Sequence, residues 1–286
     1  MKTYPTASAA ERGVARLLRG MPASDGAGVK LTRVIGSPAL GELDPFLLLD
    51  EFRSDNPGDY IAGFPEHPHR GFETVTYLIE GRVRHEDNKG HKGLLLPGSV
   101  QWMTAGHGIV HSEMPEQQDG LLWGFQLWVN LPARDKLTTP RYQEIAAAGI
   151  PEGALEDGGI ARVIAGSFAG KRGPVDANAT APLYLDMRLP GGRGADVPVP
   201  EGHNAFAYVY DGAARIGSEG KPVPRGTLAV LGPGARVRVG AESAGAKLLL
   251  VAGKPLGEPV ARYGPFVMNT AEEIHQAIRD YQAGVF

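Results

Sequence analysis

The chain has 286 residues, a formal net charge of -3, 40 glycines, 23 prolines and no cysteine. Without cysteine there is no disulfide, thiolate metal site or cysteine nucleophile, so any metal must be held by His, Asp or Glu. A charge this close to neutral gives no basic field for a phosphate backbone, and we predict no direct nucleic-acid binding.

The N-terminal twenty residues carry charges at positions 2, 11, 12, 16 and 19, so they lack the uninterrupted apolar stretch of a secretory signal. The apolar runs at 46–49 and 248–252 are far shorter than the roughly 18 to 20 residues that cross a bilayer. We therefore expect a cytoplasmic protein with no membrane partner.

Short strands separated by glycine and proline turns dominate the rest of the chain. Apolar or alternating segments occupy 29–34, 74–79, 93–96, 100–103 and 123–131, and again 183–189, 205–210, 228–231, 237–239 and 247–252. Between 140 and 178 the turn signals are denser and apolar runs are few. This pattern predicts an all-β protein of sandwich or barrel type, with an N-terminal barrel over 1–140, a connecting region over 141–178 and a C-terminal barrel over 179–286.

The end of the second barrel region has a different, helical pattern. Asn269 or Thr270 can cap the first turn, two glutamates follow, and Ile274, Ile278 and Tyr281 recur at helical spacing. These signals predict a terminal amphipathic helix.

The two strand-rich regions resemble each other. The segment from Tyr77 to Gly81 matches the segment from Tyr208 to Gly212 at an offset of 131, and 97–106 matches 225–234 at an offset of 128. The same order at nearly the same spacing indicates a duplicated barrel.

Six of the eight histidines fall between residues 67 and 111. In an extended strand, residues i and i+2 point to the same side, so His67 and His69 can reach one ion. The intervening Pro68 cannot donate to a neighbouring strand, which places this unit at a strand entrance or edge.

His111 and Glu113 form a second i, i+2 pair. If both pairs line one barrel, three imidazoles and one carboxylate converge, and this set suits a divalent first-row metal. Either motif alone more often lies on a hydrated surface than at a metal, but two such pairs in one barrel favour a metal site.

The other histidines and the large aromatic residues receive simpler interpretations. We expect His85 and His91 at a hydrated hairpin tip rather than behind the metal ligands, and His107 in a loop near the mouth of the barrel. Trp102, Trp123, Phe125 and Trp128 are expected to fill the core. No nucleophile elbow, Walker A run, dinucleotide fingerprint or zincin motif is present.

Several long strings resemble the signature of the pirins, which are bicupin proteins of the cupin superfamily. The strings that carry the resemblance are 67–75 (HPHRGFETV), 85–87 (HED), 101–106 (QWMTAG), 111–115 (HSEMP), 44–52 (DPFLLLDEF), 126–131 (QLWVNL) and 264–270 (GPFVMNT). The resemblance covers nearly the whole chain. One departure is His107, where the best-known eukaryotic pirin carries arginine.

The resemblance implies two stacked cupin β-barrels of jelly-roll type with a C-terminal helix, and one mononuclear metal, usually iron, in the N-terminal barrel. The pirin ligands fall on His67, His69, His111 and Glu113. The second barrel of the family is generally without metal, and the repeat offsets place Pro198, Pro200, Val239 and Ala241 at the corresponding positions.

The resemblance also implies an activity, because bacterial pirins include quercetin 2,3-dioxygenases. Fe(II) is the expected ion, although Mn, Co, Ni, Cu and Zn also suit these ligands. The metal would activate a flavonol for reaction with O2, with release of carbon monoxide, and Glu113 would act as general base. Quercetin could also stand in for another enolic aromatic substrate.

A second hypothesis comes from the nuclear eukaryotic pirin, an iron-dependent transcriptional coregulator. In that case the chain would be a redox-sensitive regulatory protein that acts through contacts with an unidentified protein partner. For either function we expect a monomer.

Overall fold

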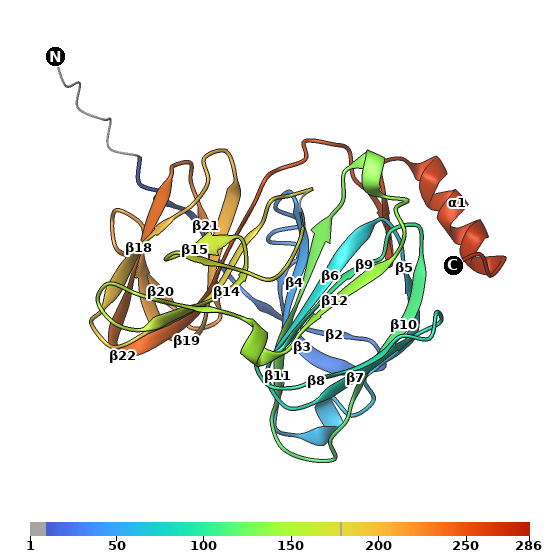
Figure 1. Ribbon diagram of the computed structural model, residues 1–286, viewed down its shortest axis with the longest axis horizontal. Helices are drawn as coiled ribbons and strands as arrows, with labels where there is room; N and C mark the ends of the chain where they lie inside the picture. The colour runs from blue at the N-terminus through green and yellow to red at the C-terminus, as the bar shows by residue number, and fades with distance from the viewer. Residues whose placement is uncertain (1–9, 178) are drawn as a thin grey trace. The chain divides into compact units, whose positions relative to one another are not determined.

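The computed structural model describes residues 10–177 and 179–286, which divide into two compact units (Figure 1). One, here called the histidine unit, comprises Gly20–Ile150, Pro174–Thr180 and Leu256–Phe286. The other, the apolar unit, comprises Met1–Arg19, described from residue 10, with Pro151–Gly173 and Ala181–Pro255.

The histidine unit is built from two antiparallel sheets and a separate two-stranded sheet formed by its last two strands. Its strands are β2 (Met21–Asp25), β3 (Val29–Ile35), β4 (Phe46–Ser54), β5 (Phe64–His69), β6 (Phe72–Glu80), β7 (Val83–Asp87), β8 (Lys92–Leu95), β9 (Val100–Thr104), β10 (Ile109–Pro115), β11 (Leu122–Asn130), β12 (Arg141–Ile145), β23 (Ala261–Tyr263) and β24 (Phe266–Met268). The larger sheet has the order β12-β9-β6-β11-β4-β3-β2 and the smaller one β5-β10-β7-β8. Short 3-10 turns lie at Pro57–Asp59, Ala133–Asp135 and Ala147–Gly149.

The apolar unit repeats part of this plan around one nine-stranded sheet, in which two strands are long. Its strands are β1 (Val14–Arg19), β13 (Glu152–Ala154), β14 (Ile160–Ala165), β15 (Ser167–Phe168), β16 (Lys171–Arg172), β17 (Leu183–Leu189), β18 (Gly194–Pro198), β19 (Asn204–Ile216), β20 (Lys221–Pro224), β21 (Thr227–Leu231) and β22 (Arg236–Gly253). The order β21-β19-β22-β17 corresponds to β9-β6-β11-β4 of the histidine unit. The duplicated all-β architecture predicted from the sequence is therefore confirmed.

The interiors of the two units differ. In the histidine unit, one apolar cluster joins both sheets and includes Leu31, Phe52 and Leu78 of the larger sheet with Val83 and Leu95 of the smaller one. Smaller apolar clusters and buried polar side chains such as Thr76 and Gln101 share the remaining interior. In the apolar unit, a single cluster of buried aliphatic residues runs through the whole interior.

The terminal helix α1 (Ala271–Gln282) begins as the sequence predicts. The Thr270 side chain accepts a hydrogen bond from the Glu273 backbone, and the Glu273 carboxylate accepts one from the Thr270 backbone. This capping box satisfies two backbone donors that would otherwise have no partner. No helix in the described ranges is long and apolar enough to cross a membrane.

The unit boundaries differ from the predicted contiguous ones, because the segment after Leu256 belongs to the histidine unit. The buried ammonium of Lys136 donates to the carbonyl oxygens of Gly71 (2.9 Å) and Val267 (3.0 Å), and Arg70 pairs with Asp280 of α1 at 2.7 Å. These long-range polar contacts fasten β24 and α1 to the histidine unit.

The predicted connecting region, described up to residue 177, contains regular strands rather than only turns. It supplies β12 to the larger sheet of the histidine unit, and β13 and β14 to the apolar unit. Strand β14 is short and buried, so its glycine-rich flanks dominate the sequence pattern and conceal it.

Candidate metal centre

Strand β5 carries His67 and His69 along one edge of the smaller sheet. It pairs only with β10 in that sheet, so the missing N–H of Pro68 leaves no gap in an interior ladder, as predicted. In the antiparallel register, His111 lies opposite His67 and Ile109 lies opposite His69. Strand pairing thus brings two histidines 44 positions apart in the sequence into direct contact.

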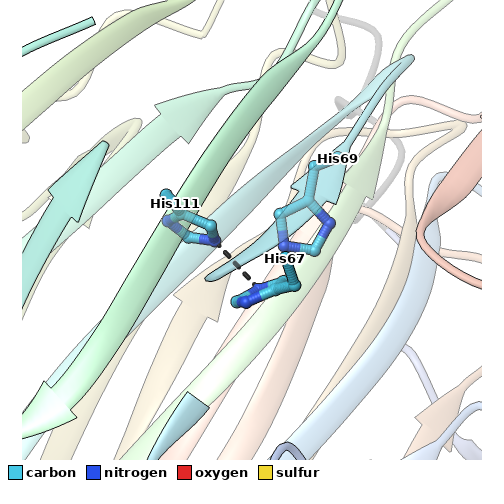
Figure 2. A group of neighbouring side chains, drawn as sticks. All are labelled: His67, His69 and His111. Atoms are coloured by element: carbon cyan, nitrogen blue, oxygen red, sulfur yellow. Dashed lines mark hydrogen bonds between the residues drawn. The ribbon is translucent and has the colours of Figure 1, made fainter. Parts of the chain in front are cut away.

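The three imidazoles form a compact group (Figure 2). One nitrogen from each of His67, His69 and His111 lies within 4.8 Å of the other two, and the Nε2 atoms of His67 and His111 are 3.1 Å apart. The ring centroids are separated by 4.5 to 5.0 Å. Among the described residues, these three histidines are the group whose ligand atoms lie close enough together to hold one metal ion.

The burial of this group sets its charge. His69 and His111 are only 2% and 1% exposed. Burial, followed by the neighbouring imidazoles, lowers the pKa of His69 well below its usual value. Burial also lowers the pKa of His111 to about 4, against the opposing effect of Glu113. Both rings are therefore neutral near pH 7 and have a free lone pair for a metal.

Hydrogen bonding outside the group orients one of the rings. Nδ1 of His67 lies 2.8 Å from the carbonyl oxygen of Pro65, to which it donates. In a neutral imidazole this leaves the lone pair on Nε2, the nitrogen that faces His111. Three nitrogen donors in this arrangement fit a divalent first-row metal.

Glu113 lies beside the three histidines but outside the group defined above. Oε1 of its carboxylate accepts a hydrogen bond from Thr76 (2.8 Å), and Oε2 accepts one from the Gln126 amide (2.7 Å). Burial alone would raise the pKa of Glu113, but His111, His67 and these two hydrogen bonds lower it overall. The carboxylate is thus ionised, and two side chains of the larger sheet hold it in position by hydrogen bonds.

Two donors in this arrangement, Thr76 and Gln126, were not predicted from the sequence. They lie opposite each other on β6 and β11. The Trp128 indole N–H donates to Oε1 of Gln126 at 3.1 Å, which directs the Gln126 amide nitrogen toward Glu113. Neither residue belongs to a ligand motif, so only the strand pairing identifies them.

The structure corrects the interpretation of His85. Instead of lying at a hydrated tip, it is fully buried, opposite Glu113 in the register of β7 and β10, with Nε2 at 2.9 Å from Glu144. His91 is exposed, as expected. His107 lies half-buried in a turn, and its carbonyl oxygen accepts a hydrogen bond from Arg70 at 2.5 Å.

A cavity of about 600 Å³ adjoins His67 and His69. Its walls include the apolar side chains of Leu48, Phe52, Phe64 and Trp128. Trp128 was expected to fill the core. It is buried, but it also lines this cavity and lies edge-on to His69, with ring centroids 5.4 Å apart. The described residues that line the cavity do not include His107.

The apolar unit has no ligand at the equivalent positions, but two of the predicted equivalents are wrong. The pairing of Ile109 with His69 and of His111 with His67 is repeated by Val237 with Val197 and Val239 with Ala195. His67 and His69 therefore correspond to Ala195 and Val197, rather than to Pro198 and Pro200. The strand register establishes this equivalence. The offset of 131 that predicts Pro198 and Pro200 applies to β6, which does not carry these histidines.

Comparison with known proteins is consistent with this architecture. The family model described as Pirin matches residues 28–129, and the one described as Pirin C-terminal cupin domain matches residues 184–286. A Pseudomonas aeruginosa relative, whose name provisionally assigns it to the quercetin 2,3-dioxygenases, is 53% identical and covers 96% of this chain and 98% of its own.

Two further relatives cover most of the chain. Human pirin is 47% identical over 91% of this chain and 88% of its own. The crystal structure of a quercetin 2,3-dioxygenase from Acinetobacter baumannii has a TM-score of 0.90 and 37% sequence identity, with 97% of this chain and 99% of that chain covered.

Proposed function

The chain belongs to the pirin family, and from that premise we propose that it is a metal-dependent dioxygenase that opens the central ring of a flavonol such as quercetin. The observation that carries the proposal is the group of three converging imidazoles, two of them buried, beside a cavity of about 600 Å³, a volume typical of small-molecule sites. The names of the Pseudomonas and Acinetobacter relatives support the choice of substrate.

In this proposal His67, His69 and His111 hold one divalent metal, and Glu113 is the fourth ligand. The donor set suits Fe(II), and Mn, Co, Ni, Cu or Zn can replace it. When bound, the metal supplies a Lewis acid for the flavonol oxygen and a partner for dioxygen.

Glu113 has a second role as general base for the 3-hydroxyl group of the flavonol. Its carboxylate is ionised because of the lowered pKa, and Thr76 and Gln126 hold both of its oxygens in position. The apolar walls formed by Phe52 and Trp128 pack against the planar rings of the substrate. Both atoms of O2 enter the depside product, and one ring carbon leaves as carbon monoxide.

An oxygen electrode and a carbon monoxide assay test the proposal on anaerobically iron-loaded protein. Quercetin should cause equal consumption of O2 and release of carbon monoxide. His111→Ala should abolish both and lower the bound iron, whereas His275→Ala, on the exposed side of α1, should change neither. Wild-type turnover no faster than that of His111→Ala would refute the proposal. Iron as the native metal, a monomeric state, a cytoplasmic location and a regulatory protein partner stay predictions.

A further inference from the structure

Two guanidinium groups line the cavity beside the histidines, and one of them is already neutralised. Arg33 donates through Nε to Oδ1 of Asp50 (3.0 Å) and through Nη2 to Oδ2 of Asp50 (2.7 Å). The same Nη2 also lies 2.7 Å from Asp25. Two carboxylates therefore compensate one cation, and Arg33 has little left to offer a ligand.

Arg262, on β23, is in a different situation. Its guanidinium lies over the Trp128 ring, 4.7 Å from the centroid, and Nη1 lies 3.4 Å from the carbonyl oxygen of Leu47. Within the described part of the chain, no carboxylate lies within 4.0 Å of it. Arg262 is exposed to solvent, so a ligand can reach it.

Arg262 feels charges of both signs, but none of the nearby carboxylates binds it directly. Partial burial and then Arg33 lower the pKa of this guanidinium, whereas the more distant carboxylates of Asp50, Asp25 and Glu42 act in the opposite direction. Glu66, the remaining carboxylate of the cavity lining, is exposed to solvent and is not within 4.0 Å of either guanidinium. Of the two guanidinium groups in the lining, Arg262 is therefore the one that an anionic group on a ligand can contact without displacing a carboxylate.

We infer that Arg262 determines specificity in this cavity, by selecting planar aromatic ligands that carry a carboxylate or ionised phenol in addition to the enolic oxygen. The inference rests on the proposed function, because the enolic oxygen is assigned to the histidine end. Stacking on Trp128 holds the planar guanidinium in place, and its fork of N–H donors matches a carboxylate. Charge-assisted hydrogen bonds of this kind are stronger than neutral ones.

A matched pair of ligands isolates this contact. One probe is 3-hydroxyflavone with a carboxylate on its phenyl substituent, and the other is its methyl ester, which has nearly the same shape but no charge. Calorimetric titration of the iron-loaded protein under nitrogen measures Kd without turnover. We expect the wild type to bind the carboxylate about tenfold more tightly than the ester.

Variants of Arg262 then test the assignment. Arg262→Gln should lose the preference for the carboxylate and bind the ester as the wild type does, and Arg262→Lys should keep part of the preference. Arg134→Gln, at a side chain 78% exposed and away from the cavity lining, is the matched control and should behave as wild type.

The outcomes separate this inference from the proposed function. Equal Kd values for the two ligands in the wild type, or a preference retained by Arg262→Gln, would overturn the role of Arg262 even if quercetin is turned over. Equal weakening of both ligands in Arg262→Gln would also overturn it, because the residue would then only shape the cavity. A preference that depends on Arg262 without turnover of quercetin would support this inference while the proposed dioxygenase activity fails.

Discussion

The two barrels share the same strand register, but equivalent positions carry polar side chains in one barrel and apolar side chains in the other. His67, His69 and His111 in the histidine unit correspond to Ala195, Val197 and Val239 in the apolar unit. The same register relates further polar residues to apolar ones: Glu113 to Ala241, His85 to Ala214, Thr76 to Ala207 and Gln126 to Leu250. All seven apolar counterparts belong to one buried cluster.

The comparison shows that the barrel does not need these polar residues in order to fold. Removing a polar side chain from water costs free energy unless its partners compensate. In the histidine unit, Nδ1 of His111 is buried with no hydrogen-bond partner among the described residues. We therefore expect the ligand set to destabilise the metal-free unit, and exchanges between equivalent positions test that expectation.

His111→Val makes the histidine unit resemble the apolar unit at one position and should have the largest effect. Mutation of a residue that hydrogen-bonds to a metal ligand typically lowers metal affinity by roughly 10- to 100-fold, and loss of the ligand itself should lower it further. Metal content after purification without chelators and O2 uptake measure this. Ile109→Val, a milder change on the same strand, should keep the metal. Full metal occupancy in His111→Val would exclude His111 as a ligand.

Acid stability of the metal-free protein should reveal the neutral imidazoles. The pKa of His111 is about 4 in the folded chain and about 6.5 when unfolded, so the unfolded chain takes up the proton first as pH falls. Between about pH 6.5 and pH 4 the free energy of unfolding should therefore fall, by up to about 3 kcal/mol for this residue. His69 shifts in the same direction and adds to the loss.

Urea denaturation in EDTA at several pH values measures this loss. Tryptophan fluorescence reports on the histidine unit, since Trp102, Trp123 and Trp128 all belong to it. His111→Val should lose less stability on acidification than the wild type. Identical pH dependence in the two proteins would mean that His111 is not buried in its neutral form.

Val239→His places a histidine at the position in the apolar unit that is equivalent to His111, and it should only destabilise that unit. An imidazole placed among aliphatic side chains has no partner, and we expect the free energy of unfolding to fall by about 2–3 kcal/mol. Far-UV circular dichroism during urea denaturation measures it, and Val239→Leu controls for added volume. Binding of a second metal ion by Val239→His would show that one histidine suffices, which contradicts the need for a converging set.

Local rules were enough to predict the pairing of His67 with His69 on one side of a strand and the terminal helix, whereas the convergence with His111 rested on the assumption that two strands face each other and on the family resemblance. Alternation along a strand places His67 and His69 on one side, and the capping signals at Thr270 and Glu273 lie within a few residues of each other. The strands themselves follow from short apolar runs between turns. Each of these inferences depends on neighbours in sequence.

Features that depend on pairing between distant strands could not be predicted in this way. His85 and Gln126 lie near Glu113 only because of the register of β7 with β10 and the packing of β11. The turn beside His85 has the composition of an exposed hairpin, so its burial has no sequence signal. The offset of 131 that led to Pro198 likewise belongs to β6, and the strands that carry the histidines follow an offset of 128.

Gln126→Leu copies the residue at the equivalent position, Leu250, and should have the smallest effect. It leaves the three imidazoles in place but removes the donor to Oε2 of Glu113. If Glu113 completes the metal site, metal affinity should fall by about tenfold, as is typical when a ligand loses its supporting hydrogen bond.

Thr76→Val provides the matched comparison for Gln126→Leu, because it removes the donor to the other oxygen of Glu113. Competition with a fluorescent chelator measures both affinities, and circular dichroism confirms folding. Similar losses in the two variants would indicate that both oxygens must be held. Unchanged metal affinity in both variants would indicate that the three histidines alone bind the metal and that Glu113 acts only as a base. The two barrels would then differ in three metal ligands rather than four.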